Sequence, residues 1–344
     1  MAEFGFALVD LTIALVHIGS RNTKLVVKNE AWLRQLNPEI RVVVCTDLPA
    51  DFFPNVNRQN VIQLPERGHW NSITNSPHSI NFRKGYWLHT LRRLAALADA
   101  HVSLGETKLL HIESDLLLLR GFPFEKISNL RLLTWIRNDA TSDSPAMIFS
   151  PSIQNSIWLA EEVKIEAKSS PGMTDMKLLN SVSKKHPEQV QYFFGGELEN
   201  KNDITFVEGN RISIFDAAPF GCYLTGTDPR NAWGISHFAS DYLPNALANA
   251  SKFNYCYSPE MGLEAFAGKT TFKIESLHIH SKNKKYFDPS QHDRLLFRAV
   301  TTGNLKVHSR SFVLRGFMAA LQEFLRALIR KASKIIQIQP RVDS

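Results

Sequence analysis

Apolar residues at the start of the chain follow two different periodicities. A run rich in β-branched residues covers about 7–18, residues with helical spacing follow from 24 to 35, and a second short apolar run covers 41–45. The first and third segments are typical of buried strands and the second of an amphipathic helix. The pattern therefore predicts that the chain opens strand–helix–strand, the unit from which parallel sheets are built.

Polar side chains stand where these two strands end. His17 closes the first strand, before Gly19-Ser20, and Thr46 and Asp47 follow the second. In an open parallel sheet, ligands bind outside the carboxyl ends of the strands, so these side chains are candidates for binding a nucleotide. Neither a Gly-x-Gly-x-x-Gly sequence nor a Walker lysine loop follows the first strand, which disfavours a dinucleotide or P-loop site. A nucleoside diphosphate that is held partly by a metal needs neither.

A basic amphipathic helix is predicted over 81–97, after a loop-dominated segment from 52 to 79. Apolar and aromatic residues recur along it with helical spacing. The basic residues between them are Arg83, Lys84, Arg92 and Arg93. In one interpretation they form a solvated face. In the other, some of them face a substrate phosphate, with Arg83 and Arg92 as the candidates.

The segment 108–119 carries the first candidate chemistry. It reads Lys-Leu-Leu-His-Ile-Glu-Ser-Asp followed by four leucines, and is expected to be a buried strand that delivers Glu113 and Asp115 to its exit. In a straight strand these two side chains share one side, where two carboxylates repel each other unless a cation lies between them. Mn²⁺ or Mg²⁺ is the candidate cation, because both take oxygen ligands. The alternative is that the two acids form only a turn or a cap.

The second half of the chain adds two further acids. Strands are predicted over 130–136 and 146–149, helices over 153–164 and 174–182, and a hairpin over 204–215. Asp175 either caps the second helix or has a catalytic role. Asp216 ends the hairpin and heads a glycine-rich, aromatic stretch, 217–230, that is long enough to wrap a polar ligand. Because acids also simply terminate strands, both interpretations of Asp216 stay open.

A late extended segment, 271–282, carries two histidines. His278 and His280 share one side of it, and Ile279 takes the other. One interpretation is an ordinary edge strand. The other is metal binding, since imidazole is an acceptable ligand for Mn²⁺. Lys282 follows within reach of any phosphate that the metal holds.

The end of the chain predicts a basic amphipathic helix over 311–336. Apolar residues recur at steps of three and four, with arginines and lysines between them. In one interpretation the helix docks on the domain or on a second subunit, as in a homo-oligomer. In the other it adsorbs peripherally to an anionic membrane surface.

Composition limits the class of protein. The chain has 344 residues, of which 44% are hydrophobic and 21% charged, close to the average for a soluble globular protein. Three cysteines without Cys-x-x-Cys pairing favour a reducing compartment over a disulfide framework or zinc site. The first residues do not predict a signal peptide. A cytoplasmic location is therefore expected. The net charge of +7 fits nucleic acid, an acidic membrane surface or a phosphate-bearing substrate, and the absence of a recognised nucleic-acid module disfavours the first.

Taken together, these motifs resemble bacterial nucleotide-sugar-dependent glycosyltransferases of the GT-A fold. The resemblance extends to about Lys285 and rests, besides the strand–helix–strand opening, on three motifs: Phe82-x-Lys-Gly-Tyr-Trp-x-x-Thr-x-Arg-Arg93, His111-Ile-Glu-Ser-Asp115 and His278-Ile-His280-Ser-Lys282. It implies an α/β fold with an open mixed sheet flanked by helices and a Rossmann-like nucleotide-binding first half. The amphipathic C-terminal helix is expected from the spacing of apolar residues alone.

The resemblance and the terminal basic helix together predict a division of the chain. One catalytic domain is expected over 1–303, with a half that binds donor nucleotide and metal (1–120) and an acceptor half (121–303). A basic amphipathic helix and tail are expected over 304–344.

In such enzymes an Asp-x-Asp signature binds Mn²⁺ and, through it, the donor diphosphate. By the resemblance, Asp115 is a metal ligand, and Glu113, in place of the first Asp, binds the metal or the donor. His280 is implied as the late ligand and Lys282 as a diphosphate partner. The donor-binding set is completed by His17, Thr46, Asp47, Arg83 and Arg92.

The implied activity is transfer of a sugar, with Mn²⁺ or Mg²⁺, from a nucleotide-sugar donor to a glycan or surface-polysaccharide acceptor. An inverting enzyme needs a carboxylate that deprotonates the acceptor hydroxyl, with Asp216 as first choice and Asp175 as second. A retaining enzyme needs no such base. Two rivals stay open: a nucleotidyltransferase, although Gly19-Ser-Arg-Asn22 lacks the repeated glycines, and a non-catalytic nucleotide-sugar-binding or scaffold protein.

Overall fold

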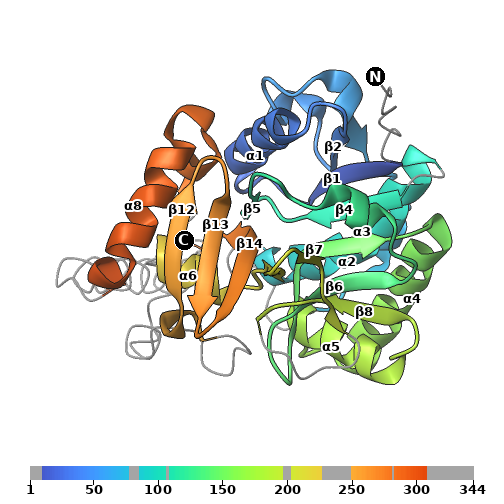
Figure 1. Cartoon of the computed structure of the whole chain (residues 1–344). Helices are drawn as coiled ribbons and strands as arrows, with labels where there is room; N and C mark the ends of the chain where they lie inside the picture. The colour runs from blue at the N-terminus through green and yellow to red at the C-terminus, as the bar shows by residue number, and fades with distance from the viewer. Residues whose placement is uncertain are drawn as a thin grey trace, which may run out of the picture.

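The computed structural model describes residues 10–76, 85–105, 108–196, 203–226, 249–280 and 283–307. Within these ranges the chain forms two sheets flanked by helices (Figure 1). The larger sheet has the strand order β3-β2-β1-β4-β7-β6-β8-β9. Its strands are β1 (Leu11–His17), β2 (Arg41–Thr46), β3 (Val61–Gln63), β4 (Lys108–Ile112), β6 (Leu133–Arg137), β7 (Asp143–Ser150), β8 (Val190–Phe193) and β9 (Asp203–Ile204).

The larger sheet is mixed. Strands β1, β2, β3 and β4 are parallel, whereas β7 is antiparallel to both β4 and β6. Helix α1 (Thr23–Leu36) connects β1 to β2, and α2 (Tyr86–Leu104) precedes β4. The predicted strand–helix–strand opening and the predicted α/β class with a mixed sheet flanked by helices are therefore confirmed. The carboxyl ends of β1, β2 and β4 meet at one edge of the sheet, the edge at which such sheets bind ligands.

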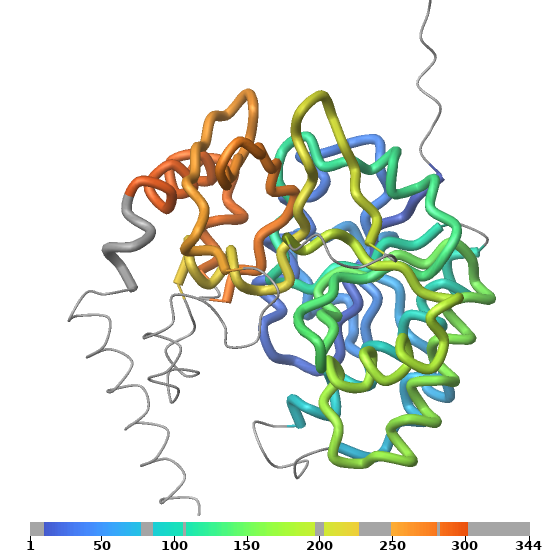
Figure 2. Tube along the Cα trace, turned by 60° about the horizontal axis from the view of Figure 1, so that its bottom comes forward, coloured from blue at the N-terminus to red at the C-terminus, as the bar shows by residue number. Residues whose placement is uncertain are grey.

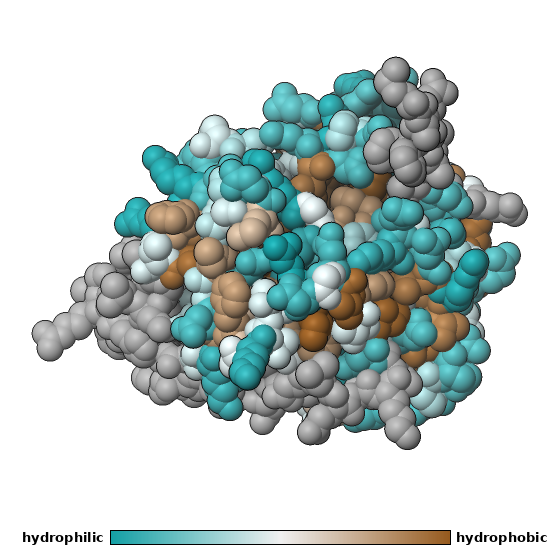
Figure 3. Space-filling model, viewed as in Figure 1, coloured by the Kyte–Doolittle hydropathy of each residue, from teal (hydrophilic) through white to brown (hydrophobic). Residues whose placement is uncertain are grey.

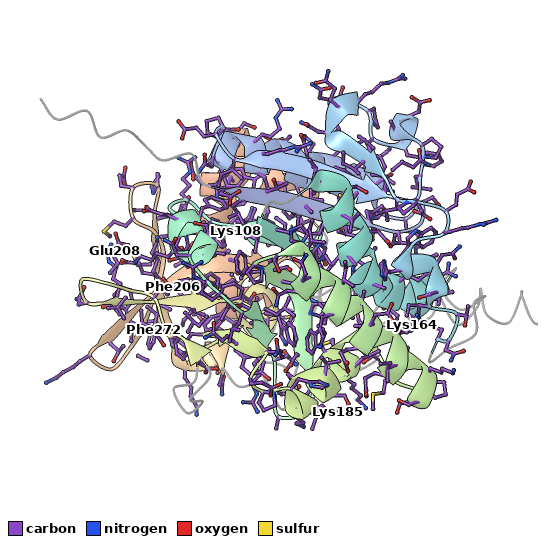
Figure 4. The ribbon with its side chains drawn as sticks, turned by 90° about the vertical axis from the view of Figure 1, so that its right-hand side faces the viewer. Lys108, Lys164, Lys185, Phe206, Glu208 and Phe272 are labelled. Atoms are coloured by element: carbon purple, nitrogen blue, oxygen red, sulfur yellow. The ribbon has the colours of Figure 1, made fainter. Side chains whose placement is uncertain are left out.

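Helices cover both faces of the larger sheet. Apolar residues of α2, α4 (Ile153–Ser169) and α5 (Asp175–Lys185) pack on one face, and those of α1 and α3 (Phe124–Ser128) pack on the other. In Figure 4, Lys164 of α4 and Lys185 of α5 lie on one side of the molecule and Phe272 lies on the opposite side. Helix α5 begins as predicted, because the Thr174 side chain accepts a hydrogen bond from the Lys177 N–H.

The smaller sheet has the order β10-β11-β14-β13-β12, and β5 pairs with β14. Its strands are β5 (Leu116–Leu118), β10 (Val207–Glu208), β11 (Arg211–Phe215), β12 (Asn254–Ser258), β13 (Gly262–Ala267) and β14 (Thr270–His278). Apolar residues of α1, α6 (Pro219–Thr225) and α8 (Pro289–Val307) pack on it. Figures 1 and 2 show α8 on the outer side of this sheet, away from α4.

Short 3₁₀ helices complete the described elements. They are η1 (Ala50–Phe52), η2 (Arg58–Asn60), η3 (His69–Ser72), η6 (Ala250–Lys252) and η7 (Lys284–Phe287). No helix in the described ranges is long and apolar enough to span a membrane. In the view of Figure 3, hydrophilic residues cover much of the described surface.

Three sequence predictions are corrected. The hairpin predicted over 204–215 is shorter, because Asp203–Ile204 pairs with β8 in the larger sheet and the antiparallel pair is β10 with β11. The single strand predicted over 108–119 is two strands, because the chain turns after β4 and β5 joins the smaller sheet. The stretch predicted as a ligand-wrapping loop contains the buried helix α6 over 219–225, and 227–230 lies outside the described residues. The starting residues of the predicted basic helix, 81–84, and the predicted terminal helix over 311–336 also lie outside them.

Candidate active site

The turn between β4 and β5 carries Glu113 and Asp115. It closes where the Leu116 N–H donates to the Glu113 carbonyl over 3.0 Å. Each sheet holds one side of it. The Glu113 N–H donates to the Ala146 carbonyl of β7 over 2.8 Å, and the Ile279 N–H donates to the Asp115 carbonyl over 2.7 Å. Both sheets therefore fix the backbone that presents the two carboxylates.

Three side chains converge at this turn. Glu113, Asp115 and His278 each offer one ligand atom, and these atoms lie within 4.8 Å of one another. His278 Nε2 is 3.2 Å from Asp115 Oδ2 and 3.5 Å from Glu113 Oε2. All three residues are buried, with 5–9% of their surface exposed. The carboxylate pair predicted from the sequence thus comes together with an imidazole that β14 supplies.

The hydrogen bond of His278 Nδ1 fixes the tautomer of the ring. His278 Nδ1 lies 2.8 Å from the Ala217 carbonyl oxygen, which only accepts hydrogen bonds, so Nδ1 carries a proton. In the neutral ring, Nε2 then points a lone pair at two carboxylates. This arrangement suits a divalent cation, and a backbone carbonyl behind a ligating histidine is the usual support for one. The residues therefore fit the metal that the sequence suggests.

His280 lies beside this group. Its ring centroid is 4.2 Å from that of His278, which agrees with the prediction that the two side chains share one side of the segment. Among the described residues, however, the histidine whose nitrogen converges with the two carboxylates is His278. The role of His280 as a ligand stays a prediction. Lys282 and Arg83, predicted to bind the donor, lie outside the described residues.

Arg93 links the turn to α5. Its guanidinium donates a hydrogen bond to Glu113, and its Nη2 is 3.9 Å from Asp175 Oδ2. Burial opposes the charged form of Arg93, but the two carboxylates outweigh it and raise the pKa of this group. Arg93 therefore stays a cation that neutralises part of the negative charge of the site.

Asp175 lies near the same Arg93 guanidinium. It follows the true cap, Thr174, so the first helical residue is free to turn its carboxylate inward, where it accepts from the Met176 N–H over 3.0 Å. Burial raises the pKa of Asp175 to about 6, although Arg93 acts in the opposite direction. A carboxyl group with a pKa near neutrality is a candidate general base.

Asp216 has a different setting. It is fully buried, and its carboxylate accepts backbone N–H groups from Phe220 (3.0 Å), Gly221 (2.7 Å) and His278 (2.9 Å). These contacts tie the start of α6 to the end of β14. Burial also raises the pKa of Asp216 to about 6, although the same N–H groups act in the opposite direction. The three hydrogen bonds give Asp216 a structural role, and its role as the first choice of base stays a prediction.

The ends of β1 and β2 lie at the same edge of the sheet. Burial, with a further contribution from Arg93, lowers the pKa of His17 to about 4, so this ring is neutral. The Asp47 carboxylate accepts the Gly19 N–H over 2.8 Å, and the buried Thr46 hydroxyl accepts the Leu48 N–H over 3.2 Å. These contacts shape the strand ends, while binding of a donor by the same residues stays a prediction.

Arg92 contacts other residues than Arg93 does, although the Asp47 carboxylate is near enough to act on the pKa of Arg92. Its Nε donates to the Ile73 carbonyl over 3.0 Å, and its guanidinium lies over the Trp70 ring, 5.4 Å from the centroid. The arginine that contacts the carboxylates is thus Arg93. Helical spacing did not separate the two arginines, because Arg92 stands four residues after Leu88 and Arg93 three residues after Thr90, and both of these residues are buried.

Comparisons with known proteins give a weak structural likeness. No protein-family model and no curated protein matches the chain. Similar solved structures include the galactosyltransferase LgtC in complex with donor and acceptor sugar analogues, with a TM-score of 0.39, and an active-site mutant of LgtC, with a TM-score of 0.40. Each is 9% identical to this chain, and each match covers 54% of this chain and 75% of that one. Another is the apo form of the glycosyltransferase GlyE in Streptococcus pneumoniae TIGR4 (TM-score 0.35, 15%, 53% and 45%).

Proposed function

We propose that this protein is a metal-dependent glycosyltransferase that moves a sugar from a nucleotide-sugar donor to a glycan acceptor. The observation that carries the proposal is the convergence of Glu113, Asp115 and His278 beside the carboxyl ends of β1 and β4. That edge is where an open α/β sheet binds a nucleotide. A buried group of two carboxylates and an imidazole there suits the diphosphate of such a donor, bound through a cation.

The residues that would hold Mn²⁺, or Mg²⁺, are Glu113, Asp115 and His278, with His280 beside them. A bound cation stabilises the charge that develops on a departing nucleoside diphosphate. The chain's own contribution is orientation. Arg93 fixes Glu113 by a hydrogen bond, and the Ala217 carbonyl fixes the tautomer of His278.

Asp175 is the carboxylate that we propose for the acceptor. If the reaction inverts configuration, this group takes the proton of the acceptor hydroxyl, for which a pKa of about 6 is well suited. Its link to Arg93 places it in the same buried cluster as Glu113. Asp216, whose oxygens are bound to three backbone N–H groups, is ranked below it.

Asp115→Asn tests the proposal with minimal change of shape. Thermal unfolding of the wild type is measured with a panel of nucleotide sugars, with and without Mn²⁺, and transfer is then measured with the donor that stabilises. We expect Asp115→Asn to abolish both the metal-dependent stabilisation by the donor and transfer, because one of the two carboxylates is lost. The matched control is Asp51→Asn, whose side chain is 79% exposed and forms a surface pair with Arg58.

The rivals give different results when the thermal panel is joined by an assay with a nucleoside triphosphate and a sugar phosphate as substrates. A nucleotidyltransferase would release pyrophosphate from a nucleoside triphosphate and a sugar phosphate. A scaffold protein would show no metal-dependent nucleotide binding in the wild type. Full activity of Asp115→Asn would contradict the proposed site.

A further inference from the structure

Asn29 of α1 contacts the turn that carries the candidate metal ligands. Its Nδ2 lies 3.2 Å from the carbonyl oxygens of Glu113 and Ser114 and 3.0 Å from that of Leu116. The residue is fully buried, and 84 positions separate it from Glu113 in the sequence. One side-chain amide therefore gathers three carbonyl groups of a single turn.

The orientation of the Asn29 amide follows from its partners. Carbonyl oxygens only accept hydrogen bonds, so the NH₂ group must face the turn. The amide oxygen, Oδ1, is buried and has no hydrogen-bond partner among the described residues. This side of α1 otherwise packs Val26 and Leu33 into an apolar cluster. An apolar residue would avoid burying the unpartnered oxygen but would leave the turn without its donors.

The backbone of the turn is thereby held at every carbonyl from 113 to 116. Asn29 binds those of Glu113, Ser114 and Leu116, and the remaining one, of Asp115, accepts the Ile279 N–H. Side chains leave the backbone in directions that its dihedral angles set. A clamp on the carbonyls therefore sets where the Glu113 and Asp115 carboxylates point.

We propose that Asn29 is a positioning residue that holds the Glu113–Asp115 turn in the geometry needed to bind a divalent cation. The inference rests on the proposed function, since it assigns Asn29 to that same metal site. It adds a residue that touches neither metal nor substrate. Removing such outer contacts of a metal site costs about 10–100-fold in metal affinity.

Trp32 supplies a matched control. It lies one turn further along α1, and its Nε1 donates to the Leu118 carbonyl over 2.8 Å. This is the same kind of bond from the same helix, but it holds β5 beyond the turn and not the turn itself. Trp32→Phe removes the bond and keeps an aromatic ring in the core.

The experiment measures Mn²⁺ affinity by calorimetry on the full-length wild type, Asn29→Leu and Trp32→Phe, with folding checked by circular dichroism. Asn29→Leu should bind Mn²⁺ at least about tenfold more weakly, whereas Trp32→Phe should stay within about twofold of the wild type. If Asn29→Leu does not fold, Asn29→Ser replaces it, because serine is smaller and keeps a hydrogen-bond donor. Asn29→Ser should also bind Mn²⁺ more weakly than the wild type.

Each result decides between the two proposals. A folded Asn29 variant with wild-type Mn²⁺ affinity overturns the positioning role and leaves the proposed function standing. An equal loss in Trp32→Phe also overturns it, because the effect would then come from loosening α1 in general. Failure of the wild type to bind Mn²⁺ overturns the metal site and the positioning role with it.

Discussion

Asp175→Asn is expected to make the protein more stable and less active. Burial raises the pKa of Asp175 from 3.8 to about 6, so the folded protein favours the protonated form. The favourable contribution of Asp175 is therefore complete below pH 4 and is lost as the pH rises to 6. Raising the pKa of Asp175 by about two corresponds to about 3 kcal/mol in the free energy of unfolding. This value already includes the attraction between Asp175 and Arg93. Asparagine keeps the shape and never ionises.

The free energy of unfolding in urea, measured from pH 4 to 8 in metal-free buffer, gives the comparison. The difference between Asp175→Asn and the wild type should grow between pH 4 and 6 and stay constant, at up to about 3 kcal/mol, above pH 6. Asp51→Asn, at an exposed position, should follow the wild type throughout. Transfer by Asp175→Asn should fall by about 10²-fold or more if Asp175 is the base. Parallel stability curves for Asp175→Asn and the wild type would refute the assigned effect of burial.

The remaining predictions concern the other charged groups of the site. His278→Gln should weaken Mn²⁺ binding by about tenfold or more, measured by calorimetry, and His280→Gln should do so less, because the His278 nitrogen is the one that meets the carboxylates. The reverse order would make His280 the ligand. Arg93→Met should lower the free energy of unfolding by about 3–5 kcal/mol at pH 8, since it leaves Glu113 and Asp175 buried without a cation. The loss should shrink towards pH 4, where both acids can protonate, and a loss independent of pH would contradict this cause.

The parts of the fold that depend on neighbouring residues could be predicted from the sequence. Apolar periodicity is enough to find β1, α1 and β2, and a threonine followed by an apolar helical pattern is enough to place the start of α5 at Thr174. The acids at the end of β4 were also found, because an apolar run that stops at two carboxylates is a local signal. These features are set by residues a few positions apart.

The other features depend on strands that pair although they are far apart in the sequence. The four leucines at 116–119 gave no sign that β5 leaves the larger sheet, because the partner of β5, β14, lies more than 150 residues further along the chain. The same pairing brings His278 to Asp115. Alternation along a strand puts His278 and His280 on one side but does not say which of them meets the turn. That depends on where β14 ends, which is a property of the assembled sheet.

Gly221 illustrates how one such contact reaches the candidate site. In the sequence it belongs to the glycine-rich stretch, 217–230, that is predicted to wrap a polar ligand. In the structure it lies in α6, where any side chain would collide with the backbone carbonyl of His278 and with the Asp216 carboxylate. Glycine thus lets α6 approach the end of β14 closely, and the backbone just before α6 then offers the Ala217 carbonyl to His278 Nδ1. A glycine that contributed to the prediction of a ligand-wrapping stretch is therefore needed for close packing, and that packing directs His278 Nε2 toward Glu113 and Asp115.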